Sequence, residues 1–336
     1  MKRWPTFSIR SKGRLLAVLA LLTALAALLS ICLGAVFVPP GQVFGALSGQ
    51  ITGTPEARIV LFARLPRTCG CLLAGMALAV SGAVIQGVLN NPLAAPNIIG
   101  VNSGAGLAVA LCSAVFPGVS GPLAAFFGAL AGVFLVLFIA EKTGAARITL
   151  VLAGVAVSSM FSAGIDAVLT FVPDALNGYS DFRIGGLANL SMSRILPAFW
   201  VIAIAMVLAL ALSGELDILL LGAETAQSLG LPAKPLRLVL LALAAALAGA
   251  AVSFCGLLGF VGLIVPHIMR RLVGEESFWL LFSCALGGAA LLTYCDLLAR
   301  ILFAPYELPV GIVLSLAGGP FFIWLLLRQR GGRTHD

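Results

Sequence analysis

The chain has 336 residues, of which 61% are hydrophobic and only 10% are charged. A soluble domain carries about 25% charged residues, and a soluble fold of this length lacks the interior to hide so much apolar surface. The composition therefore excludes an ordinary soluble enzyme or binding domain and predicts a protein solvated by a lipid bilayer. The net charge of +7 does not indicate a nucleic-acid partner here, because in a membrane protein the distribution of basic residues between loops is what matters.

Ten apolar segments follow one another along the chain. A helix needs about 20 mainly apolar residues to cross the hydrocarbon core of a bilayer. Nine long runs lie at residues 15–38, 66–89, 97–116, 120–140, 148–172, 195–213, 236–254, 279–299 and 308–327, and a shorter glycine-rich one at 255–270. The first run is longer than the about 7–15 residues of a signal-peptide core, so we expect a first span instead of a cleaved signal. The predicted fold class is an all-α polytopic membrane protein with about ten transmembrane helices.

The basic residues decide between ten spans and the competing count of nine. With ten spans, one side collects both termini and 14 of the 20 basic residues, namely Lys2, Arg3, Arg10, Lys12, Arg14, Lys142, Arg147, Lys234, Arg237, Arg270, Arg271, Arg328, Arg330 and Arg333. The other side keeps six, namely Arg58, Arg64, Arg67, Arg183, Arg194 and Arg300. Nine spans would move the C-terminal arginines outside and weaken this asymmetry. Since basic loops stay in the cytoplasm, we expect ten spans with both termini cytoplasmic.

The segments between the spans define the rest of the predicted organisation. A single transmembrane domain, residues 15–328, lies between cytoplasmic tails at 1–14 and 329–336. Three periplasmic segments are expected at 39–65, 173–194 and 300–307, and one cytoplasmic segment at 214–235. Within the last, residues 222–230 predict a short helix, because Glu224 suits the positive end of a helix dipole and Gly230 suits a C-terminal cap.

The sequence offers little that could carry catalysis. It contains no GxxxxGK[ST] phosphate loop, no HExxH and no GxSxG, and only two histidines. The seven cysteines lie mostly inside apolar runs and are interpreted as small buried side chains. We therefore predict no catalytic, cofactor-binding or metal-ligating residue, and an energy source supplied by a partner.

A few charged residues within or beside the spans could have a function. Asp296 lies four residues before Arg300, one helical turn, which makes an ion pair near the outer end of the helix possible. Asp166 has no such neighbour, and it either faces a water-filled pathway or packs on another polar side chain. Arg64 and Arg67 are either anchors at the headgroup level or a docking patch for carboxylates of a soluble partner.

Several strings in the sequence resemble the FecCD-type permeases, the membrane subunits of bacterial ABC importers for iron–siderophores, haem and cobalamin. The strings are Arg64-Leu65-Pro66-Arg67-Thr68, Ser81-Gly82-Ala83 to Gln86, Asn91-Pro92-Leu93-Ala94, Leu152-Ala153-Gly154-Val155-Ala156, Glu224-Thr225-Ala226, Ser228-Leu229-Gly230, Gly259 to His267, Asp296 to Arg300 and Glu307 to Ile312. They run from about residue 56 to 327. The resemblance implies a type II ABC importer permease architecture, a homodimer with a path along the subunit interface, two cytoplasmic ATPase subunits and a periplasmic binding protein.

The resemblance also implies roles for individual residues. Arg64, Arg67 and Arg300 match the family's arginines that receive acidic residues of the binding protein. The segment 216–230 matches the helix that docks on the ATPase, with coupling residues Leu219, Gly222, Glu224, Thr225, Ala226, Ser228, Leu229 and Gly230. The sequence departs from the family at Asn90, where an arginine is common, at Ala223, where a glutamate is usual, and at Phe182 to Gly186. The last departure weakens any inference about the cargo.

Three further expectations complete the prediction. Gln86, Asn90 and Asn102 are candidates to line the translocation path, beside glycine-rich stretches at 82–106 and 249–262 that suit close helix packing. The cargo expected is a metal chelate, an iron–siderophore by default, with haem and cobalamin as alternatives, carried across a bacterial inner membrane. Two other functions remain open: a secondary transporter coupled to an ion gradient through Asp166, and a non-transporting membrane scaffold.

Overall fold

The fold is taken from a computed structural model that describes residues 9–34, 36–51, 53–116, 120–143, 147–302, 304 and 306–330. Within these ranges every regular element is a helix and no strand occurs. The outer parts of both predicted tails, residues 1–8 and 331–336, lie outside the described residues. The all-α fold class is therefore confirmed for the part of the chain that the structure describes.

Each of the ten predicted spans coincides with a helix. The ten helices are α1 (Ile9–Cys32), α4 (Leu65–Leu89), α5 (Val101–Val115), α6 (Gly121–Lys142), α7 (Arg147–Phe171), α9 (Met192–Ala211), α12 (Ala233–Cys255), α13 (Val261–Val273), α14 (Ser277–Ile301) and α15 (Val310–Arg330). Among the described residues, seven are long and apolar enough to cross a membrane unaided. The remaining three, α5, α13 and the described apolar part of α15, are shorter and depend on their neighbours.

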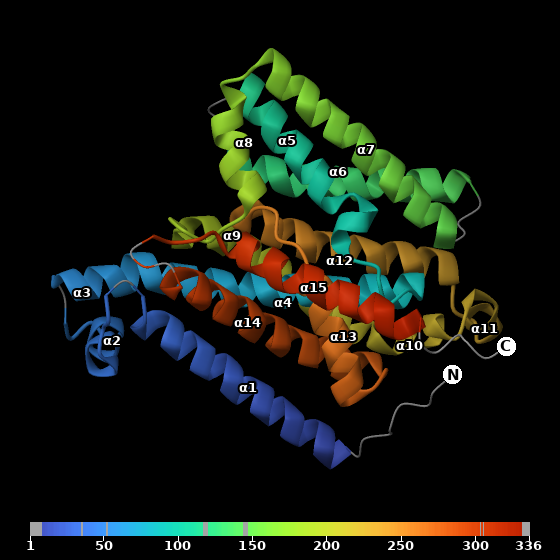
Figure 1. The fold of residues 1–336 in the computed structure, drawn as a ribbon. Coiled ribbons are helices and arrows are strands. Elements are labelled where there is room, and N and C mark those ends of the chain that lie inside the picture. The colour runs from blue at the N-terminus through green and yellow to red at the C-terminus, as the bar shows by residue number, and fades with distance from the viewer. Residues whose placement is uncertain are drawn as a thin grey trace.

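Helix α4 forms the centre of the molecule and is buried along most of its length. It packs against α12, α13 and α14, while α1 covers α14 and the group α5 to α8 stands to one side of the central helices (Figure 1). The packing is close because glycines face each other: a Cβ on Gly82 would lie 1.9 Å from the carbonyl oxygen of Gly262 in α13. The predicted use of the glycine-rich stretches for close packing is confirmed at this contact.

The helix starts of α5 and α13 were predicted too early. A 3-10 turn, Pro96–Ile99, precedes α5, and Gly100 with φ of 88° separates the two. The span predicted from residue 255 begins only at Val261, because Gly256 and Phe260 take positive φ angles of 70° and 67° and the chain between them is not helical. Left-handed backbone of this kind ends a helix regardless of the apolar character of the sequence.

Short helices mark the two ends of the bundle. At one end lie α2 (Pro40–Leu47), α3 (Pro55–Arg58), the π-helix η1 (Ile59–Arg64) and α8 (Ala175–Ile184). At the other end lie α10 (Ser213–Leu220) and α11 (Ala223–Ser228), where α1 starts and α15 ends (Figure 1). The described ends of the chain thus share one side, as ten spans require. Lys12 of α1 pairs there with Glu276 at 2.5 Å, just before α14.

Candidate functional site

The predicted periplasmic end of the bundle, called the outer end below, holds a cluster of charged residues centred on Asp296 of α14. This carboxylate is completely buried. It accepts hydrogen bonds from Nε and Nη2 of Arg67 on α4 at 2.9–3.1 Å and pairs with Nε of Arg300, one turn along α14, at 3.2 Å. The predicted pairing of Asp296 with Arg300 is confirmed, and Arg67 joins it from a helix 229 positions away in the sequence. The two arginines neutralise the Asp296 carboxylate, whose charge would be costly to bury without a partner.

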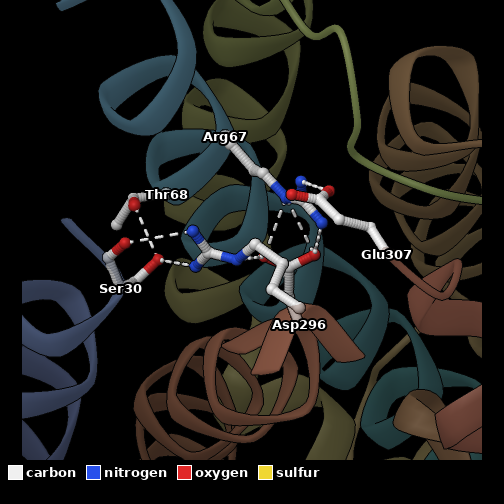
Figure 2. Close-up of polar contacts among 6 residues, drawn as sticks. Ser30, Arg67, Thr68, Asp296 and Glu307 are labelled. Atoms are coloured by element: carbon white, nitrogen blue, oxygen red, sulfur yellow. Dashed lines mark hydrogen bonds and ion pairs between the residues drawn. The ribbon is translucent and has the colours of Figure 1, made fainter. Parts of the chain in front are cut away.

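Further partners extend this cluster to α1 and to the segment before α15 (Figure 2). Arg67 Nη1 donates to Glu307 at 2.5 Å. Arg300 Nη2 donates to the hydroxyl of Ser30 at 2.7 Å, and that hydroxyl lies 2.8 Å from the hydroxyl of Thr68. Sequence reasoning gave Ser30 no role and quoted Glu307 only as part of a matched string. The signal for Glu307 was its place just before a span, on the same predicted side as the arginines.

Arg64 belongs to the same region, but its hydrogen bonds within the described residues go to backbone carbonyls. It lies at the end of η1 and donates through Nη1 to the carbonyls of Ile31 and Cys32, both at 2.8 Å, and through Nη2 to the carbonyl of Val36. The last carbonyls of a helix have no partner within the helix, and a cation there also complements the helix dipole. Arg64 therefore closes the C-terminal end of α1.

The three predicted docking arginines, Arg64, Arg67 and Arg300, all line one cavity of about 530 Å³ at the predicted periplasmic end. Their residues are only 6%, 9% and 4% exposed, so neither Arg64 nor Arg67 is a headgroup anchor at the surface. The exposed ring of Phe62 and the segment Ala188 to Ser191 form other parts of the wall. The structure brings the three arginines together, and their docking role remains a prediction.

The predicted coupling segment is a pair of short helices at the opposite end. Helices α10 and α11 meet at Gly222, whose φ of 114° favours glycine. Glu224 occupies the first turn of α11, as predicted. The helix ends in a Schellman motif, because the N–H of Leu231 donates to Ala226 at 2.9 Å and the N–H of Gly230 donates to Gln227 at 2.9 Å. The predicted cap at Gly230 is confirmed.

This helix pair has an exposed side and an anchored side. The exposed residues of α11 and its cap are Glu224, Thr225, Gln227, Ser228, Leu229 and Gly230. Leu219 of α10 and Ala226 of α11 are buried. Leu216 packs over Gly87 near the end of α4, and a carboxylate oxygen of Asp217 accepts the backbone N–H of Ser277 at the start of α14 at 2.9 Å. The pair is thus fixed to the two helices that carry Arg67 and Asp296 at their other ends.

The three residues predicted to line a path lie in different environments. Gln86 is only 2% exposed, donates to the carbonyl of Gly262 at 3.2 Å and accepts from Arg270 Nη1. Its amide therefore joins α4 to α13 inside the protomer, away from the protomer's surface. Asn90 is exposed and has φ of 46°, which ends α4, and Asn102 is half-buried in the first turn of α5. The structure does not gather them into one site.

A different polar surface lies on α7. A shallow groove of about 580 Å³ lies between α7 and the turn before α5, lined by the polar residues Asn97, Ser158, Ser159, Ser162 and Asp166 and by the apolar residues Ile98, Val155 and Ala163. Asp166 is exposed and makes no ion pair with any residue in the described ranges. An exposed carboxylate within a membrane-spanning helix is unfavourable against lipid, so this face of α7 is suited to water or to another polar surface.

Comparison with known proteins places the chain in a family. Residues 21–328 match the FecCD transport family. The hemin transport system permease protein HmuU of Yersinia pestis is 41% identical over 295 residues, 84% of this chain and 88% of that protein. The iron(3+)-hydroxamate import system permease protein FhuB of Bacillus subtilis strain 168 is 38% identical over 330 residues, 96% of this chain and 86% of that protein.

A solved inward-facing conformation of a metal-chelate type ABC transporter has a TM-score of 0.80 at 30% identity, covering 94% of this chain and 99% of the solved one. The resemblance seen in the sequence is confirmed over nearly its whole length, and the chain belongs to the FecCD transport family.

Proposed function

We propose that this chain is the membrane-spanning permease subunit of an ATP-binding-cassette importer for a metal chelate. In this proposal it works as a homodimer in the bacterial inner membrane, with two cytoplasmic ATPase subunits and a periplasmic binding protein. The observation that carries the proposal is the pair α10–α11, which exposes a polar surface at one end of the bundle while it is anchored to α4 and α14. The other ends of these two helices form the arginine cavity.

The geometry supports a mechanical link between the two faces of the membrane. An ATPase that closes on ATP would push on the exposed residues of α11, and the motion would pass into α10 through the short joint at Gly222. The contacts Leu216–Gly87 and Asp217–Ser277 would transmit it to α4 and α14. Because Arg67 and Asp296 join these helices again at the outer end, α4 and α14 would move together.

The polar face of α7 is the part of the protomer best suited to a path. Its groove carries serine hydroxyls and the Asp166 carboxylate on a surface that lipid does not favour. We propose that a second copy of the chain covers this face and that the cargo passes between the two copies. The path therefore follows α7 and the start of α5, which retains Asn102 as a candidate and leaves Gln86 inside the protomer.

The cargo is proposed as a class only. The two relatives described above are named for hemin and for iron(3+)-hydroxamate, which are both metal chelates. An iron–siderophore is the first candidate, and haem or cobalamin are the alternatives.

Reconstitution tests the proposal. The chain is incorporated into vesicles with the ATPase subunits and the binding protein that co-purify with it, and uptake of a 55Fe-labelled hydroxamate chelate and of hemin is measured. We expect uptake of one of them only when ATP and both partners are present. Uptake by the chain alone, driven by an ion gradient, would overturn the proposal in favour of a secondary transporter.

Asp166 distinguishes the two mechanisms in the same assay. In a gradient-driven transporter this carboxylate is the candidate coupling site, so Asp166→Asn would abolish uptake. In the proposed importer it only lines the path, and Asp166→Asn should leave the ATP dependence of uptake intact. Asp174→Asn, an exposed acid outside the spans, is the matched control.

A further inference from the structure

Arg67 holds two carboxylates that differ sharply in their surroundings. Asp296 is completely buried, accepts three hydrogen-bond contacts from Arg67 and is shared with Arg300. Glu307 makes one contact, to Arg67 Nη1 at 2.5 Å, and its side chain is 42% exposed. Asp296 is therefore a permanent part of the fold, whereas Glu307 can leave Arg67 and return to water at little cost.

The other two arginines of the cavity present their donors elsewhere. Both terminal nitrogens of Arg64 donate to backbone carbonyls at the end of α1. Those of Arg300 donate to the carbonyl and the hydroxyl of Ser30. Freeing either guanidinium would strip buried backbone and side-chain acceptors of their partners. Among the described contacts of these arginines, Arg67 Nη1 is the terminal nitrogen whose partner is a half-exposed side chain, so it can change partner without leaving a buried acceptor unpaired.

The charges of the cluster favour the arrival of an acid. Arg64, Arg67 and Arg300 carry three positive charges, and Asp296 and Glu307 carry two negative ones, which leaves one positive charge in excess. This excess attracts a carboxylate toward the cavity. Glu307 lines both this cavity and a second one of about 570 Å³, so its side chain has space to move into.

We propose that Glu307 occupies the position on Arg67 that a carboxylate of the soluble binding protein takes when it docks. Docking would exchange one acid for another at Arg67 Nη1, and the partner would present one exposed Asp or Glu to each copy of this chain. This inference rests on the proposed function, since it requires a binding protein. Within that function it names Glu307, the residue that the incoming acid replaces, as the residue that sets the docking affinity.

The test measures the affinity of the binding protein for the assembled transporter in lipid nanodiscs. Glu307→Gln keeps the shape of the side chain and removes its charge, so the partner's acid no longer competes with it. We expect Kd to fall about two- to fivefold, the range of one exposed ion pair. Asp174→Asn removes an exposed acid from the same predicted side and should change Kd less, because it lies outside the cavity.

The outcomes separate this inference from the proposed function. Arg67→Ala removes the guanidinium that receives the acid and should raise Kd, with binding of the ATPase subunits kept as the sign of a folded protein. An unchanged or weaker affinity in Glu307→Gln, alongside a raised Kd in Arg67→Ala, overturns the exchange and leaves the docking site in place. Absence of docking by the unaltered transporter overturns the proposed function itself. If Glu307→Gln does not assemble, Glu307→Ala carries the same expectation.

Discussion

Asp296 and Glu307 contact the same guanidinium, but only the first is needed to hold the fold. Removing the charge of Asp296 leaves Arg67 and Arg300 facing each other inside the protein without their common acid. Breaking a buried ion pair in this way costs about 3–5 kcal/mol. We therefore expect Asp296→Asn to lower the thermal unfolding midpoint of the purified protein strongly.

Glu307→Gln is the matched control for this prediction. It removes one carboxylate from the same arginine, but its half-exposed ion pair is worth less than about 1 kcal/mol. The midpoint should change little. Equal losses of stability in the two variants would contradict the distinction between a structural and an exchangeable acid.

Arg64 is the residue for which structure and family resemblance point to different roles. The resemblance implies docking, whereas its contacts show a cap on the last carbonyls of α1. Arg64→Gln should leave at least one of these carbonyls unpaired and cost about 1–3 kcal/mol, measured as a lower unfolding midpoint. Arg58→Gln, an exposed arginine in the neighbouring α3, should have no such effect. Loss of docking at unchanged stability would instead support the docking role.

At the scale of helices, α4 depends on the absence of side chains where it crosses its neighbours. A Cβ on Gly82 meets the backbone of Gly262, which cannot rotate away as a side chain can. Gly82→Ala should push α4 and α13 apart and cost about 1–3 kcal/mol, the range for overpacked cores. This loss of stability is measured as a lower thermal unfolding midpoint and as a smaller amount of protein in the membrane.

Gly319→Ala makes the same chemical change in α15, at a position where an added Cβ meets nothing within 4 Å. Alanine favours a helix over glycine by about 1 kcal/mol, so this variant should be neutral or slightly stabilising. A Gly82→Ala protein as stable as Gly319→Ala would show that the two helices can separate without loss.

The helices were largely predictable, because hydropathy over 20 residues is a property of the local sequence. The positions where helices are interrupted could not be predicted in the same way. Helices α5 and α13 start late because Gly100 and Phe260 have positive φ angles, and an aromatic residue such as Phe260 does not indicate a positive φ angle from sequence. The short helix predicted over residues 222–230 is present as α11, but the matched segment 216–230 is not one helix, because the structure divides it at Gly222 into α10 and α11.

The outer cluster was predictable only in part, for a different reason. Asp296 and Arg300 lie one turn apart, so their pairing follows from helix geometry. Arg67 and Ser30 reach them from distant helices, and no local pattern encodes such contacts. The family resemblance brought the arginines together as a group, but the contacts of Arg67 with Asp296 and Glu307 were visible only once the helices were placed.

At the scale of the whole molecule, the arginine cavity and the pair α10–α11 are connected by the same two helices. Helices α4 and α14 are joined at the outer end by Arg67 and Asp296 and at the other end by α10, through Leu216 and Asp217. Helix α7 stands apart from this frame and exposes most of its surface (Figure 1). The joined helices α4, α14 and α10 are suited to transmit motion from one end of the protomer to the other. The exposed helix α7 is suited to contact a second copy in the proposed homodimer.

The assembled protein should therefore have water along α7, and cysteine labelling tests this. A thiol reacts with maleimide only as the thiolate, which forms in water and not in lipid. Ser162→Cys, in the polar groove, should react with a membrane-impermeant maleimide in intact transporters. Phe134→Cys, on the exposed apolar face of α6, should stay unreactive because that face contacts lipid. The labelling of the unaltered chain gives the background from the native cysteines, most of which are buried, and this background is subtracted. Equal, slow reaction at both positions would mean that α7 lies against lipid or a dry interface, and the path would then have to be sought on another face of the protomer.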